Sequence, residues 1–210
     1  FVLGGAKISD AFLMMETVLK NSVADTVLTG GLVANIMLAA NGEEIGSGSR
    51  EFIHENGFDD FIEDAKQLLT KYPQKIVLPS TLAYIENGQR KEAPPDLLPA
   101  DAAVLDIGSQ TARHYADIIK DAKTVFVNGP MGVFENPQTQ DGTKIVWDAL
   151  AQTEGYTVIG GGDSITATAK YDATDRIDYI CTGGGALIRF LSGEELPVVK
   201  ALRYAAEAFK

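Results

Sequence analysis

Short apolar runs that end in glycine are the clearest indication of fold in this 210-residue chain. They are spread along the whole sequence, as FVLGGAK, TVLTGG, VFVNGPMG, TVIGGGDS and YICTGGGA. Each run is short and nearly continuous, which is typical of strands buried on both faces of a parallel sheet. The glycines leave the following turns without side chains, so they are either tight turns or places where a ligand approaches the backbone.

Strands and helices are predicted to alternate along the chain. The predicted strands are residues 1–3, 26–29, 75–78, 103–107, 124–127, 157–159 and 178–181. The predicted helices are residues 9–20, 32–40, 49–71, 109–120, 141–154, 164–170 and 184–191. This alternation predicts one α/β domain, a three-layer Rossmann-like sandwich with a central, mostly parallel sheet and right-handed crossovers. Residues 82–101 interrupt the pattern with an Asn-Gly pair and three of the eight prolines, which predicts a surface hairpin.

The net charge of −11, from 29 acidic and 18 basic residues, argues against a nucleic-acid partner. A small phosphate ligand remains compatible with this charge, since helix N-termini bind phosphates through backbone N–H groups, helped by a lysine or a metal ion. No apolar stretch is long enough to span a bilayer, and the single Cys181 excludes an intrachain disulfide. We therefore expect a cytoplasmic protein with no membrane partner.

The glycines follow the predicted strands at their carboxyl ends, which is where doubly wound sheets bind ligands. Neither the P-loop pattern nor GxGxxG is present, because Ile188 stands where the third glycine after Gly183 and Gly185 would be. Hydride transfer is therefore disfavoured. Asp163 follows the glycines at a predicted helix start, where a carboxylate either caps the helix, the commoner role, or holds a hydrated magnesium ion. Lys7 follows the first glycines and can reach a phosphate as a point charge.

Several of these motifs occur together in one order, GGAKISD, TGGLVANIML, DIGSQTA, VNGPMGVFE followed by DGTK, IGGGDS and TGGGALIRFLSGEELPVVKAL. As a set they resemble the C-terminal, nucleotide-binding half of phosphoglycerate kinases, over essentially all of residues 1–210. The resemblance implies a monomeric lobe that binds ATP or ADP with Mg²⁺. The resemblance further implies that this lobe is part of a phosphotransferase, which moves a phosphoryl group between 1,3-bisphosphoglycerate and ADP in glycolysis and gluconeogenesis.

The resemblance also implies roles for the residues at matching positions. The expected adenine slot is formed by Ala6, Gly30, Gly31 and Leu105, and the expected ribose ligand is Glu135. The residues expected beside the phosphates are Lys7, Asn128 and Gly129. The helix start at the β- and γ-phosphates comprises Gly161, Gly162, Asp163 and Ser164, and Asp163 is expected to direct the metal. The N–H donors to the transferring group are expected from Thr182, Gly183, Gly184 and Gly185. The expected catalytic residues are Lys7, Gly162, Gly184 and Gly185.

The sequence departs from this family's pattern in two ways. Many members carry a second lysine four residues after the first, but here the position is Ala11, a replacement associated with the archaeal type. No N-terminal domain, which would hold 3-phosphoglycerate or 1,3-bisphosphoglycerate on basic side chains, is recognisable, and the start inside a strand without methionine indicates a fragment. We expect this chain alone to bind nucleotide with negligible turnover. An NAD-dependent enzyme and a non-catalytic Rossmann-like module remain as alternatives, although Lys7, Glu135 and Asp163 together argue against the latter.

Overall fold

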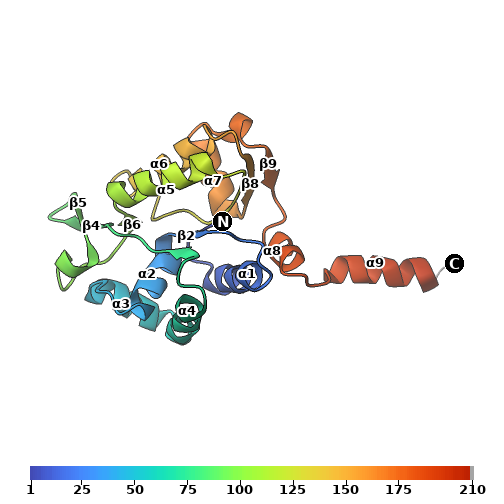
Figure 1. Ribbon diagram of the computed structural model, residues 1–210, viewed down its shortest axis with the longest axis horizontal. Coiled ribbons are helices and arrows are strands. Elements are labelled where there is room, and N and C mark those ends of the chain that lie inside the picture. The colour runs from blue at the N-terminus through green and yellow to red at the C-terminus, as the bar shows by residue number, and fades with distance from the viewer. Residues whose placement is uncertain (209–210) are drawn as a thin grey trace.

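A computed structural model describes residues 1–208, and a parallel six-stranded sheet runs through its middle (Figure 1). The strand order is β3-β2-β1-β7-β8-β9. The strands are β1 (Val2–Leu3), β2 (Val27–Thr29), β3 (Ile76–Val77), β7 (Thr124–Asn128), β8 (Tyr156–Gly160) and β9 (Tyr179–Cys181). The chain starts in the centre of this sheet and adds strands outward on both sides.

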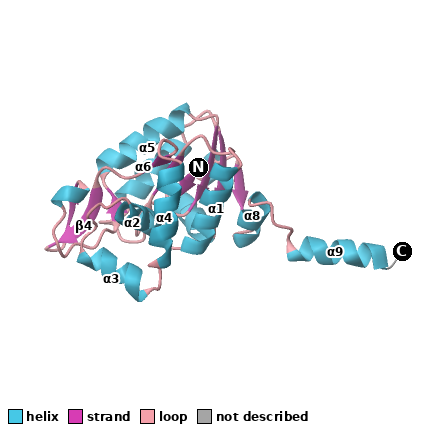
Figure 2. Cartoon of the chain, turned by 60° about the horizontal axis from the view of Figure 1, so that its bottom comes forward, coloured by secondary structure: helices cyan, strands magenta, loops and turns pink. Residues whose placement is uncertain are grey.

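Helices cover both faces of the sheet (Figures 1 and 2). One face carries α1 (Ile8–Lys20), α2 (Gly31–Ala40), α4 (Asp60–Lys71) and α8 (Gly185–Leu191). The other face carries α5 (Ser109–Asp121), α6 (Asp141–Leu150) and α7 (Gly162–Lys170), followed by a 3₁₀ turn (Thr174–Arg176). Because strand side chains alternate, Val2 is buried in one core and its neighbour Leu3 in the other. The predicted three-layer sandwich is confirmed.

A second, antiparallel sheet lies beside the main one. It has the order β5-β4-β6, with β4 (Leu82–Glu86), β5 (Gln89–Ala93) and β6 (Asp106–Ile107), and a 3₁₀ turn (Pro95–Leu97) lies between β5 and β6. The predicted surface hairpin is confirmed as β4–β5. The prediction of residues 103–107 as a strand of the parallel sheet is wrong, because only Asp106 and Ile107 are strand and they pair antiparallel with β4. Side chains of other segments hydrogen bond the backbone of Val104 instead.

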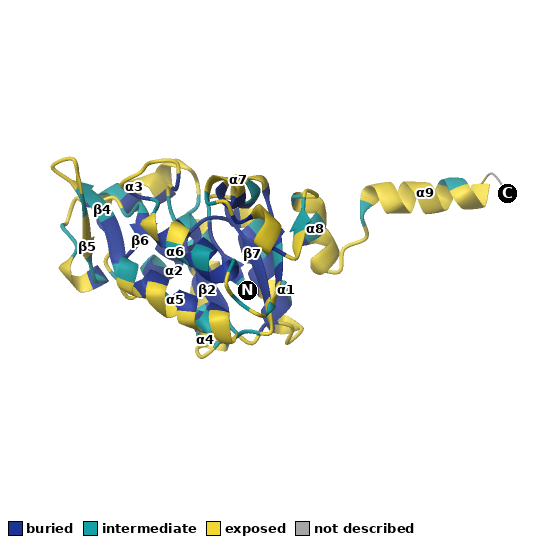
Figure 3. Ribbon diagram, turned by 90° about the horizontal axis from the view of Figure 1, so that it is seen from above, coloured by how far each residue is buried: buried dark blue, intermediate teal, exposed yellow. Residues whose placement is uncertain are grey.

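Two helix predictions also need correction. The single helix predicted over 49–71 is two helices, α3 (Ser47–Glu55) and α4, because Gly57 between them has a φ of +70° that no helix accommodates. Helix α9 (Pro197–Ala208) is absent from the sequence predictions and projects away from the rest of the molecule (Figure 3). None of its residues is buried, and Val198 and Leu202 are 70% and 65% exposed. Within residues 1–208, no helix combines the length and apolarity needed to cross a membrane.

The glycines after β1 and β7 allow two loops to pack backbone against backbone. The Gly5 N–H donates to the Pro130 carbonyl at 2.8 Å. Gly129 has a φ of +93°, and a Cβ added to it would collide with the carbonyl of Gly4. Gly88 in the β4–β5 turn has a similar φ of +74°, but a Cβ there would meet no atom within 4 Å. The two glycines therefore share a positive φ, but only Gly129 lacks room for a side chain.

We predict that Gly129→Ala lowers the free energy of unfolding by about 3 kcal/mol or more, because backbone strain and overpacking add. The matched control Gly88→Ala carries only the strain, about 1 kcal/mol. Urea unfolding followed by circular dichroism measures both. Equal losses in the two variants would contradict the packing of these loops.

Candidate functional site

The glycine runs of the sequence meet at one edge of the parallel sheet. The strand register aligns Thr29, Leu3, Asn128, Gly160 and Cys181 across β2, β1, β7, β8 and β9. The residues that follow these five are Gly30, Gly4, Gly129, Gly161 and Thr182. All five loops therefore leave the sheet side by side at its carboxyl edge, the usual ligand position in such sheets.

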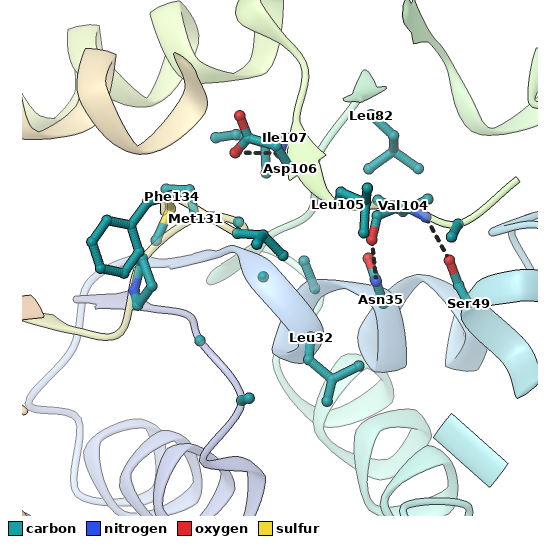
Figure 4. Close-up of a pocket in the computed structure, with 18 of the residues that line it drawn as sticks. Leu32, Asn35, Ser49, Leu82, Val104, Leu105, Asp106, Ile107, Met131 and Phe134 are labelled. Atoms are coloured by element: carbon teal, nitrogen blue, oxygen red, sulfur yellow. Dashed lines mark hydrogen bonds between the residues drawn. The ribbon is translucent and has the colours of Figure 1, made fainter. Parts of the chain in front are cut away.

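A cavity of about 320 Å³ lies beside this edge, between α2, α3, β6 and the loop after β7 (Figure 4). The predicted site residues that line it are Ala6, Gly31, Leu105, Glu135 and Asp163. Much of the remaining lining is apolar, including Leu32, Leu82, Val104, Ile107, Met131 and Phe134. A cavity of this size and character, with few polar groups, suits a flat, largely apolar ligand moiety.

A much smaller recess of about 10 Å³ adjoins the main cavity. The two share Gly5, Ala6 and Asp163. The recess is otherwise lined by Gly4, Lys7, Asn128, Gly129 and Gly161. Its side chains with polar ends are an ammonium, an amide and a carboxylate, in contrast to the apolar cavity. The site therefore has an apolar cavity beside a narrow polar recess.

Asp163 stands in the first turn of α7, where it lines both spaces. The cap position of this helix is held by Gly161, and no side chain makes a cap hydrogen bond there. The Asp163 carboxylate is thus not used as a helix cap and is exposed beside the recess. The first N–H groups of a helix lack intrahelical partners, so this helix start can accept an anion.

Four further predicted residues lie at the edge without lining either space, two of them buried. Gly30 is buried at the start of α2, with Met131 packed where a Cβ would be. Ser164 is fully buried, and its Oγ accepts a hydrogen bond from the Gly129 N–H at 2.7 Å. Gly162 and Gly183 are exposed. Ser164 therefore joins α7 to the loop after β7.

The remaining predicted residues follow β9, outside both cavities. Thr182 and Gly185 are exposed, and Gly184 is half-buried before the start of α8. A Cβ added to Gly162, Gly184 or Gly185 would meet no atom within 4 Å. Packing does not require glycine at these three positions, in contrast to Gly4 and Gly129. Their backbone is open to a ligand approaching from solvent.

Sequence reasoning missed the residues that build the back of the main cavity. Asn35 of α2 donates to the Val104 carbonyl at 3.2 Å, and Ser49 of α3 accepts from the Val104 N–H at 2.8 Å (Figure 4). Phe52, half exposed, also lines the space. Asn35 and Ser49 lie 69 and 55 positions before Val104, so no local sequence pattern predicts these contacts.

Asp106 is the buried carboxyl group of the main cavity. Burial raises the pKa of this carboxyl to about 7, while the Gly142 N–H and the Arg90 guanidinium act in the opposite direction. Burial also raises the pKa of Tyr171 to about 12, helped by the carboxylates of Asp106 and Asp141.

Within residues 1–208, no cluster of three or more histidine, cysteine, aspartate or glutamate side chains is arranged to hold a metal ion.

Comparison with known proteins identifies the family. The phosphoglycerate kinase family model matches residues 1–194. A phosphoglycerate kinase of Methanothermobacter thermautotrophicus is 45% identical over 202 residues, which are 96% of this chain and 49% of that protein. One of Pyrococcus abyssi is 41% identical over 214 residues, covering 100% of this chain and 52% of that protein.

Solved structures agree with the sequence comparison. The crystal structure of phosphoglycerate kinase from Pyrococcus horikoshii OT3 matches with a TM-score of 0.90 at 40% identity, over 98% of this chain and 52% of that chain. The enzyme structure from Coxiella burnetii matches with a TM-score of 0.83 at 30% identity, over 95% and 51%. The chain spans about half the length of these relatives. On sequence and fold together, the chain belongs to the phosphoglycerate kinase family.

Proposed function

We propose that this chain is the C-terminal, nucleotide-binding lobe of a phosphoglycerate kinase and that it binds Mg-ADP and Mg-ATP. One observation carries the proposal. The apolar cavity of about 320 Å³ lies next to the recess that contains Lys7, and Asp163 lines both. A nucleotide has the same two parts in the same order, a flat base and an anionic phosphate tail.

The base would lie in the main cavity against Ala6, Gly31 and Leu105, which line it. Glu135, at the rim of the same cavity, would accept hydrogen bonds from the ribose hydroxyls. The phosphates would extend into the recess beside Lys7 and Gly129 and reach the first turn of α7. This placement is supported by the uncapped start of α7, since its free N–H groups suit phosphate oxygens.

The residues present fit a magnesium ion that arrives with the nucleotide. The net charge of −11 disfavours a bare triphosphate, so a neutralising cation is expected. Magnesium commonly takes one or two protein carboxylates and completes its shell with phosphate oxygens and water. The exposed carboxylate of Asp163 meets that requirement. When bound, the ion would neutralise charge that develops on the transferred phosphoryl group.

Phosphoryl transfer depends on position and charge stabilisation rather than on a protein nucleophile. The backbone N–H groups of Thr182 to Gly185 would face the transferring group, and Lys7 would supply the positive charge. Ala11, where many members have a second lysine, is only 2% exposed and packs into the core. The chain therefore leaves Lys7, the metal and backbone donors to stabilise the phosphates.

Asp163 offers a direct test of nucleotide binding. We expect saturable binding of Mg-ADP to this chain by calorimetry, and about tenfold weaker binding by Asp163→Ala, since the metal loses its protein carboxylate. Asp175→Ala, which removes the same charge at an exposed position in another segment, should leave the affinity unchanged. NAD should give no signal. A chain that binds neither nucleotide, or binds NAD in preference, would overturn the proposed function.

For Ser164, the next residue in the sequence, we expect a substitution to lower the stability of the fold. Ser164→Ala leaves the buried Gly129 N–H without an acceptor, which should cost about 1–3 kcal/mol of unfolding free energy. Thr166→Ala on the same helix removes only an exposed hydrogen bond to the Gly162 carbonyl and should cost about 0.5 kcal/mol or less. Chemical denaturation distinguishes the two, and equal effects would argue against the Ser164–Gly129 contact.

A further prediction concerns turnover by the chain alone. The six arginines lie in six different elements, α3, β5, α5, the 3₁₀ turn at 174–176, α8 and α9. A bisphosphoglycerate would need clustered cations, which the family's other lobe is expected to supply. We expect negligible ATP formation from 1,3-bisphosphoglycerate and Mg-ADP in a coupled assay with this chain. Turnover comparable to an intact relative would show that both substrates bind here.

A further inference from the structure

In addition to the pairing of β4 with β6, one arginine joins the β4–β5 hairpin, a surface excursion in the sequence, to the wall of the main cavity. Arg90 lies on β5, and its side chain is only 14% exposed. Its Nη1 donates to Asp106 Oδ2 at 3.0 Å and to the Gln138 carbonyl at 3.1 Å. Its Nη2 donates to the Ile107 carbonyl at 3.1 Å. One guanidinium thus connects the hairpin, β6 and the loop after β7.

Asp106 accepts a hydrogen bond from this guanidinium at a buried site that also supplies two backbone N–H donors. Its side chain is fully buried and lines the main cavity. Oδ2 also accepts from the Gly142 N–H at 2.8 Å, and Oδ1 accepts from the Ile107 N–H at 2.9 Å. A Cβ added to Gly132 would lie 2.6 Å from Oδ1, and one added to Gly142 would also collide with it. The carboxylate therefore holds together β6, the start of α6 and the loop after β7.

Glu135 stands on that loop, and contacts on both sides hold the loop in place. Before it, the Val133 N–H donates to the Leu105 carbonyl at 2.8 Å, and Lys170 donates to the Phe134 carbonyl. After it, Gln138 accepts from Arg90 through its carbonyl and donates through Nε2 to the Gly88 carbonyl at 2.8 Å. The hairpin therefore holds the loop on the C-terminal side of Glu135, through the contacts of Arg90 and Gly88 with Gln138.

We propose that Arg90 is a positioning residue for nucleotide binding, and that it acts by fixing the loop that carries Glu135 through Asp106 and Gln138. This inference rests on the proposed function. An arginine suits the role because its planar fork serves several acceptors at fixed angles, whereas a lysine offers a single point charge. Arg90 also donates from Nε to Glu92 at 2.9 Å, and Glu92 accepts from the Ser109 N–H at the start of α5. The guanidinium is thereby fixed on its other side as well.

The test uses Arg90→Lys, which keeps a positive charge beside the buried carboxylate and removes the fork. We expect Mg-ADP to bind this variant on the order of tenfold more weakly in calorimetry, because the loop loses its fixed position. Arg176→Lys is the matched control, since Arg176 is exposed and donates only to the Asp172 carbonyl of its own turn. The control should bind like the unaltered chain.

A double-mutant cycle with Glu135→Gln separates positioning from general loosening. If Arg90 acts through Glu135, Arg90→Lys should lose most of its effect in the Glu135→Gln background, so that the two losses are not additive. Amide hydrogen exchange should also become faster at Val133 and Gly142 in Arg90→Lys. Additive losses, or unchanged exchange at both amides, would overturn the inference.

Two further outcomes are distinguishable. Failure of the unaltered chain to bind Mg-ADP would overturn both the proposed function and this inference. Normal binding by the unaltered chain and by Arg90→Lys would overturn the role of Arg90 alone. If Arg90→Lys does not fold, Gln138→Ala removes only the exposed bond to Gly88 and keeps the Arg90–Asp106 pair. We then expect about twofold to threefold weaker binding, non-additive with Glu135→Gln, and unchanged affinity would count against the hairpin.

Discussion

The loops after β1 and β7 pack backbone against backbone, and this contact organises the carboxyl edge of the sheet. Gly5 donates to Pro130, Gly31 donates to Met131, and Gly129 leaves no room for a side chain beside Gly4. This contact joins the centre of the sheet to the start of α2 at the carboxyl edge. It also forms the floor of both spaces, because Gly5, Pro130 and Gly31 line the main cavity and Gly4 and Gly129 line the recess.

Glycine serves two different purposes along this edge. At Gly4 and Gly129 the backbone of a neighbouring loop occupies the space that a Cβ would need. At Gly162, Gly184 and Gly185 that space is open, so the absence of a side chain leaves N–H groups accessible instead. Packing therefore explains the first group by itself but not the second, in which Gly184 has a φ of +49° that favours glycine. The family assignment and the position of Asp163 agree with a phosphate there.

The antiparallel hairpin shows how a segment outside the main sheet contributes to the site. Arg90 compensates the buried charge of Asp106, and burial of such a charge without a partner is strongly unfavourable. The same guanidinium contacts Gln138, so the electrostatic requirement of one residue fixes the backbone beside Glu135. Helix α9 has no such partner within residues 1–208, and its apolar residues stay exposed.

The sequence by itself determined the α/β class, the parallel sheet and its glycine edge, because strand burial and glycine turns are local properties of each run. It also predicted the site residues Ala6, Gly31, Leu105 and Glu135, which do line one cavity. Tertiary structure decided that residues 103–107 leave the main sheet and that Ser164 faces Gly129. It also decided that Asn35 and Ser49 build the cavity wall and that Arg90 holds Asp106, which lines the same cavity. These outcomes depend on contacts between residues 16 to 69 positions apart, and no local periodicity encodes them.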